Sequence, residues 1–180
     1  AVEQLQRARE LAVRGATFTN IDERDAIADE VGHLRNSLVD LANSRHQNRG
    51  LFSGFSTSDA VANVGGIWTY QGDAGEVNRR IGEQEVVTVN VIAADAFGFN
   101  AAKDVFTVLD ELEAALYAND TPAIETALAD VDDSLQTVLG GLGIIGARAN
   151  QVETAMARNA DDMITLTQQL SSLEDVDIAE

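Results

Sequence analysis

Apolar residues recur at alternating steps of four and three through the last third of this chain. The positions in phase are Ile124, Leu128, Val131, Leu135, Val138, Leu142, Ile145, Ala149, Val152, Met156, Asn159, Met163, Leu166, Leu170 and Leu173. Only Asn159 interrupts this a/d pattern of a heptad repeat, so the sequence predicts one helix of about fifty residues. Asp120 or Thr121 can cap its start, and Pro122 suits its first turn.

Three earlier segments repeat the helical spacing more briefly. Residues 1–15, 21–44 and 101–118 each carry an apolar stripe, which predicts three further helices. The stripes are Leu5, Ala8, Leu11 and Ala12; Ile27, Val31, Leu34, Leu38 and Leu41; and Ala102, Val105, Leu109, Leu112 and Leu116. No capping residue precedes Ala1 and the heptad phase lasts to Leu173, so we expect the chain to be cut from a longer protein.

Four glycines, Gly140, Gly141, Gly143 and Gly146, fall within the long helical pattern. Each costs about 1 kcal/mol relative to alanine inside a helix. Because the heptad phase passes through them without a slip, we expect neighbouring helices to pack closely there, with some bending, rather than a break.

The segment from Gly50 to Gly98 has no helical period and is rich in Gly, Ser, Thr, Val and aromatic residues. Its strand candidates are residues 67–70, 76–81 and 84–92, the last two separated by Gly82-Glu83. In the third candidate Val87, Val89 and Val91 alternate with polar residues, which predicts a strand with one buried face.

Together these patterns predict a mainly α fold, an elongated rod of long antiparallel helices with a small antiparallel β-hairpin element inserted in the middle. Residues 1–49 are the N-terminal helical part, 50–100 the β-rich insertion and 101–180 the C-terminal helices. We expect them to form one continuous structural domain built from both ends of the chain.

The charge balance restricts the possible partners. The 180 residues include 30 Asp and Glu against 12 Lys and Arg, a formal net charge of -18. Phosphate-rich partners require clustered positive charge, so nucleic acid and anionic membranes are not expected to bind. Cysteine is absent, which excludes disulfides, zinc–thiolate sites and cysteine nucleophiles.

The sequence contains no recognisable catalytic or metal-binding arrangement. His33 and His46 are too far apart to form a metal pair on one helix turn, and both are expected to be exposed. Asp130, Asp132 and Asp133 lack the glycine turn and terminal Glu of a calcium loop, so we interpret them as a solvated helix face. We therefore expect no catalytic residue, no cofactor, no metal and no enzyme activity.

The helical ends resemble the conserved helices of the bacterial flagellin family. The resemblance rests on Leu5 to Arg14, Asp22-Glu23-Arg24, Leu41-Ala42-Asn43, Gly146 to Glu153 and Leu173 to Asp177. The middle is similar to the hook-associated branch of that family, found at the hook–filament junction. That similarity rests on Leu51 to Phe55, Tyr70 to Asp73, Ile81-Gly82-Glu83, Val89-Asn90-Val91 and Phe97-Gly98.

The resemblance implies a structural protein of the bacterial flagellum. Its members are exported through the flagellar type III channel and act outside the cell, so an extracellular location is implied. The hook-associated branch self-assembles into a ring that joins hook to filament and supports flagellin assembly, with the neighbouring hook-associated protein and flagellin as partners. It also implies terminal polymerisation segments beyond both ends of this chain, without which the fragment is expected to be monomeric in solution.

Arg7, Arg9 and Leu11 are the candidate subunit contacts, because the two arginines interrupt the apolar stripe of the first helix with forked hydrogen-bond donors. Their alternative role is intramolecular pairing with the acidic flanks of the heptad helix. Two alternatives for the whole chain also stay open. It could be a filament flagellin subunit, or a heptad-based adaptor module with an acidic face, unrelated to flagella.

Overall fold

The computed structural model describes residues 1–17, 20–82 and 85–177, with side chains as far as Leu173. Its backbone divides into two compact units. The first comprises Ala1–Val77 and Asn90–Gly143, and the second comprises Asn78–Val89 and Ile144–Glu180. The predicted fold class is confirmed, since long helices dominate and the strands form small antiparallel pairs.

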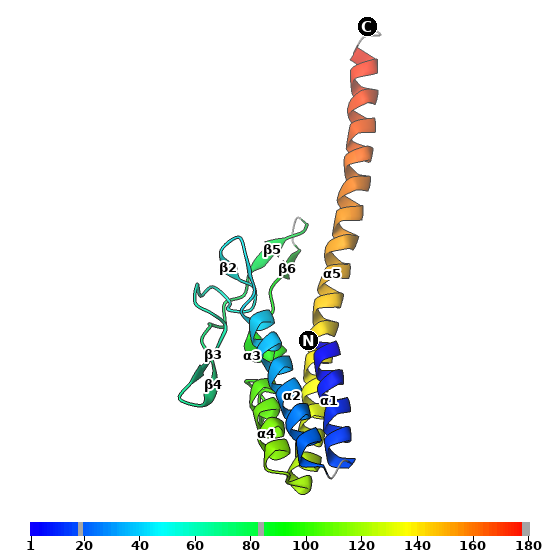
Figure 1. The fold of residues 1–180 in the computed structure, drawn as a ribbon. Coiled ribbons are helices and arrows are strands. Elements are labelled where there is room, and N and C mark those ends of the chain that lie inside the picture. The colour runs from blue at the N-terminus through cyan, green and yellow to red at the C-terminus, as the bar shows by residue number, and fades with distance from the viewer. Residues whose placement is uncertain (18–19, 83–84, 178–180) are drawn as a thin grey trace. The chain divides into compact units, whose positions relative to one another are not determined.

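Helices α1 (Val2–Thr17), α2 (Ile21–Ala42), α4 (Val105–Tyr117) and the first part of α5 (Thr121–Asp177) make up the bundle of the first unit (Figure 1). Side chains that accept hydrogen bonds from free backbone N–H groups mark three of the helix starts. Asn20 accepts from Asp22, Asp104 from Phe106 and Thr107, and Asp120 from Ala123.

The predicted helix over 101–118 therefore begins later than expected. The cap at Asp104 makes Val105 its first residue and leaves Ala102 outside it. The long C-terminal helix is confirmed, including its predicted start at Asp120 and Thr121.

The apolar stripes of these helices form the core of the first unit. Its fully buried members include Leu5, Leu11, Val31, Leu38, Leu109, Leu112, Leu116, Ile124 and Val131. Phe106 lies at the centre of an aromatic group, with ring centroids 5.4 Å from both Trp68 and Phe97 and 5.9 Å from Phe99. The core therefore joins α4 to the β-rich segment.

Among the described residues, the small antiparallel β element that the sequence predicted consists of three separate two-stranded sheets instead of one hairpin. The first unit holds β1 (Arg45–His46) with β2 (Arg49–Gly50), and β3 (Val61–Val64) with β4 (Ile67–Tyr70). The second unit holds β5 (Asn78–Arg80) with β6 (Val86–Thr88). A short helix, α3 (Ala93–Ala96), was also not predicted from the sequence.

Strand β4 coincides with the predicted strand over 67–70, whereas β3 went unrecognised. The two are joined by Gly65 and Gly66, whose φ angles of 65° and 89° suit a two-residue hairpin turn. The strand expected over 84–92 ends at Thr88. Beyond it, Val89 is 47% exposed, and the side chain of Asn90 bonds to Gly75 and Val77 instead of continuing the ladder. Glu83, expected in the turn before it, lies outside the described residues.

The expectation of close packing at the helix glycines is wrong at three of the four positions. A methyl group added at Gly140, Gly143 or Gly146 would meet no atom of this chain within 4 Å, and at Gly141 it would lie 3.7 Å from the Cα of Ala96. Helix α5 nevertheless runs through all four without interruption.

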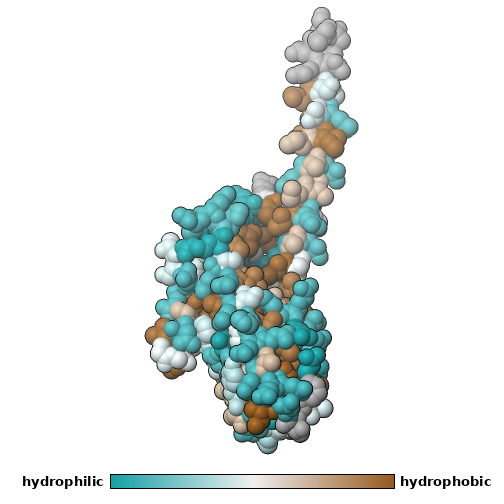
Figure 2. All heavy atoms as spheres, in the orientation of Figure 1, coloured by the Kyte–Doolittle hydropathy of each residue, from teal (hydrophilic) through white to brown (hydrophobic). Residues whose placement is uncertain are grey.

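The second unit places the β5–β6 hairpin on α5. Val87 and Ala155 are buried, Arg158 lies 3.6 Å from the carboxylate of Glu85, and the side-chain amide of Asn159 donates to the carbonyl of Ile81. From Met156 onwards the apolar heptad positions of α5 are exposed (Figure 2). Met156, Met163, Leu166, Leu170 and Leu173 are all more than half exposed.

Candidate assembly surfaces

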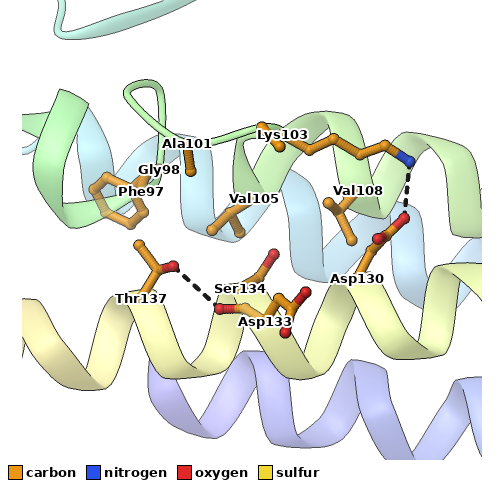
Figure 3. Close-up of a pocket in the computed structure, with 11 residues that line it drawn as sticks. Phe97, Gly98, Ala101, Lys103, Val105, Val108, Asp130, Asp133, Ser134 and Thr137 are labelled. Carbon is orange, nitrogen blue, oxygen red and sulfur yellow. Dashed lines mark hydrogen bonds and ion pairs between the residues drawn. The ribbon is translucent and has the colours of Figure 1, made fainter.

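A cavity of about 270 Å³ lies between the segment that precedes α4 and the first part of α5 (Figure 3). At its edge Lys103 donates to Asp130 over 2.8 Å and to Glu111 over 2.6 Å, and the bond to Asp130 is the main cause that raises the pKa of Lys103 to about 12. The ammonium group is therefore held by two carboxylates and is a poor proton donor or nucleophile near neutral pH.

Among the described residues no group of three or more His, Asp or Glu side chains is placed to hold a metal ion. Within that same part of the chain, none of the helices combines the length and the apolar character needed to cross a bilayer.

The candidate contact residues Arg7 and Arg9 lie on α1 and make ion pairs within the chain. Arg7 bonds through Nε to Glu30 on α2 over 2.7 Å, and Arg9 bonds through Nε to Asp132 on α5 over 2.5 Å. These hydrogen bonds raise the pKa of both arginines. The intramolecular pairing considered from the sequence is therefore present, while 40% and 47% of the two side chains stay exposed.

Leu11 lies about one turn beyond Arg7 on the same helix. It is fully buried in the core, so it contributes to any surface by holding α1 in place. Of the acidic residues interpreted as solvated, Asp133 is exposed, but Asp130 and Asp132 are half-buried in the ion pairs with Lys103 and Arg9. The two histidines are exposed, as expected.

A polar network that the sequence did not reveal fixes the β3–β4 hairpin to the bundle. The indole of Trp68 donates to Asp110 on α4, and Arg35 on α2 donates both to Asp110 and to Glu113. Asn43 at the end of α2 adds two bonds of 2.9 Å to the backbone of Val61. Arg35 and the carboxylates of Asp110 and Glu113, which are three residues apart, could be read from the sequence. That Trp68 lies beside them could not.

The burial of one arginine, Arg24, was likewise not predicted from the sequence. Arg24 is 5% exposed and donates to the carbonyls of Gly15 and Asn119 and to the hydroxyl of Thr121. It thus ties the end of α1 to the turn between α4 and α5.

The described residues form a helical bundle with small antiparallel hairpins, and the charged side chains exposed on it are candidate contact surfaces. Known proteins resemble the chain in sequence and in fold. The chain is 30% identical over 197 residues to flagellar hook-associated protein 3 of Escherichia coli strain K12. The match covers 96% of this chain and 62% of that protein, so the chain spans less than two thirds of its relative's length. No family model matches the chain.

Solved structures share the fold. Xanthomonas campestris FlgL superposes with a TM-score of 0.83 at 18% identity, over 95% of this chain and 89% of that one. The flagellar junction protein FlgL of Legionella pneumophila superposes with a TM-score of 0.79 at 17% identity, over 91% and 86% of the two chains. The sequence match is to flagellar hook-associated protein 3, and the solved structures show that the fold is shared.

Proposed function

We propose that this chain is part of a structural protein of the bacterial flagellum, which forms the junction ring between hook and filament and supports the assembly of flagellin. The observation that carries the proposal is the similarity to flagellar hook-associated protein 3 along 96% of the chain. The fold shared with a flagellar junction protein supports the same role.

The mechanism is adhesion, with no bond broken. Each subunit presents one surface to its neighbours in the ring, one to the adjoining hook-associated protein and one to flagellin. Repeated heterologous contacts of this kind build rings and tubes. We place the assembled protein outside the cell, after export through the flagellar channel.

Within this role, residues 1–49 and 101–180 act as the helical body and residues 50–100 as the β-rich insertion. The exposed portions of Arg7 and Arg9 supply part of the subunit contact on α1. Their internal ion pairs support this use, since Glu30 and Asp132 hold the guanidinium groups in fixed positions on the surface.

Deleting the gene in the source organism tests the proposal. Electron microscopy of the hooks is combined with an assay for flagellin in the medium. Bare hooks with flagellin monomers in the medium are the expected result, because exported subunits have nothing to assemble on. Bare hooks without flagellin in the medium would instead favour a filament subunit, and normal filaments would exclude both flagellar roles.

A further inference from the structure

The chain has few basic residues, and most of them form ion pairs or hydrogen bonds with other residues of the same chain. Of the 12 basic residues, seven form the ion pairs and hydrogen bonds of the structure, namely Arg7, Arg9, Arg24, Arg35, Arg45, Lys103 and Arg158. Among the described residues, Arg14, Arg49, Arg79 and Arg80 have side chains that bond to none of the others. Two of these four, Arg79 and Arg80, are adjacent, and both are exposed on strand β5.

The structure holds this basic strand firmly. Arg79 and Arg80 pair with Val87 and Val86 of β6, and the hydroxyl of Thr88 donates to the side chain of Asn78 over 2.8 Å. The hairpin is in turn held on α5 by the bonds of Arg158 and Asn159 within the second unit. Neighbouring side chains leave a strand on opposite faces, so the two guanidinium groups are spread apart.

The same chain contains a surface of opposite charge. Between Lys103 and Arg148 it has no basic residue. On α5, Glu125 and Asp133 are exposed, and among the described residues neither carboxylate has a partner. They lie eight residues apart, which is about 12 Å along a helix and within about 80° around it. These exposed carboxylates carry the charge opposite to that of the guanidinium groups on β5.

We propose that Arg79 and Arg80 of one copy dock on the Glu125–Asp133 face of α5 in a second copy. The inference rests on the proposed function, because it names the contact by which the ring subunits hold one another. Two copies that each carry a net charge of -18 repel each other. An interface between them is therefore favoured where it places Arg79 and Arg80 against carboxylates. The contact is heterologous, and repetition of it adds subunit after subunit.

Charge reversal tests the contact in the full-length protein. The double variant Arg79→Glu, Arg80→Glu should weaken self-association roughly tenfold or more in sedimentation experiments at low salt. In the deletion strain it should leave hooks bare while the variant protein is still exported. The matched control is Arg14→Glu, Arg49→Glu, which changes the net charge equally at two other exposed arginines and should restore filaments as the wild type does.

The acidic face is tested by exchange of charges. The variant Glu125→Arg, Asp133→Arg should also fail to assemble, and the fourfold variant that combines both reversals should regain self-association. Circular dichroism confirms that each variant is folded before its assembly is scored.

Three outcomes overturn the inference. If R79E/R80E restores filaments as well as the wild type does, the basic strand is not a contact, although bare hooks in the deletion strain would still support the junction role. If R79E/R80E fails but E125R/D133R assembles normally, the arginines bind an acidic partner other than a second copy. Filaments in the deletion strain itself would remove the junction role and this inference together.

Discussion

The indole nitrogen of Trp68 donates a 2.6 Å hydrogen bond to Oδ2 of Asp110, forty-two residues further along the chain. Oδ1 of the same carboxylate accepts from Arg35, so a single aspartate joins strand β4 to helices α2 and α4. The indole ring also lies 5.4 Å from that of Phe106, in the core. The indole of Trp68 therefore fixes the β3–β4 hairpin to the bundle by one polar and one apolar contact.

Replacing Asp110 with Asn should loosen this hairpin. The amide keeps one acceptor but loses the charge that pairs with Arg35, and we expect the free energy of unfolding to fall by about 1 kcal/mol. Trp68 is the only tryptophan, so its fluorescence should shift to longer wavelength as water gains access. The control Asp40→Asn removes an exposed charge on α2 and should change neither quantity. An unchanged emission spectrum in D110N would show that the aspartate does not hold the hairpin.

Arg24 should be among the most sensitive polar positions. Arg24→Met removes the donors from three acceptors at the helix ends, and loss of buried hydrogen bonds predicts about 1–3 kcal/mol lower stability in urea unfolding. Arg24→Lys keeps the charge but not the planar fork, so it should recover only part of the loss. Arg14→Met, at an exposed arginine on α1, is the control. Equal stability of R24M and R14M would contradict the role of Arg24.

Replacing glycines of α5 with alanine should raise the stability, whereas replacing Gly15 with alanine should lower it. Gly140, Gly143 and Gly146 face open space, so each change to Ala should stabilise the helix by about 0.5–1 kcal/mol. Gly15→Ala should destabilise, because the new methyl group would overlap the side chain of Leu116. Thermal unfolding of the four single variants measures both signs. Stabilised variants that fail to assemble would place these glycines against a neighbouring subunit.

Stability should decline in alkali between about pH 10 and pH 12. The pKa of Tyr70 is raised to about 12, mainly by burial, and that of Tyr117 to about 12, mainly by its hydrogen bond to Asp29. Asp130 and Glu111 raise the pKa of Lys103 to about 12 as well. In each case the folded chain binds the proton more tightly than the unfolded chain. The contribution is therefore complete below the ordinary pKa and disappears as pH rises through the folded value.

Ultraviolet titration of the phenols checks this directly, because the chain has only 2 tyrosines. Both should ionise near pH 12 in the folded protein and near pH 10 in urea. Tyr117→Phe should leave a single shifted phenol, and a midpoint near 10 for Tyr70 in the folded protein would contradict its burial.

Local patterns were sufficient for the longer helices because burial and capping follow the spacing of residues along one segment. The four-and-three step located α5, and the β-branched run at residues 67–70 located β4. Strands β1, β2 and β3 were missed, since segments such as Val61–Val64 carry too little pattern to be distinguished from loop. The prediction of close packing at the glycines of α5 was wrong, because the sequence does not show whether other atoms lie near a given residue.

The sequence by itself determined the mainly α class, the long heptad helix, the acidic charge and the resemblance to the flagellin family. These depend on periodicity, composition and ordered motifs, all of which are properties of neighbouring residues. Only the tertiary structure decided that Arg7 and Arg9 already have carboxylate partners and that Arg35 and Trp68 share Asp110. It also decided that Arg79 and Arg80 of β5 have no such partner among the described residues. Those pairings join residues far apart in the chain, and folding alone brings their charges within hydrogen-bonding distance.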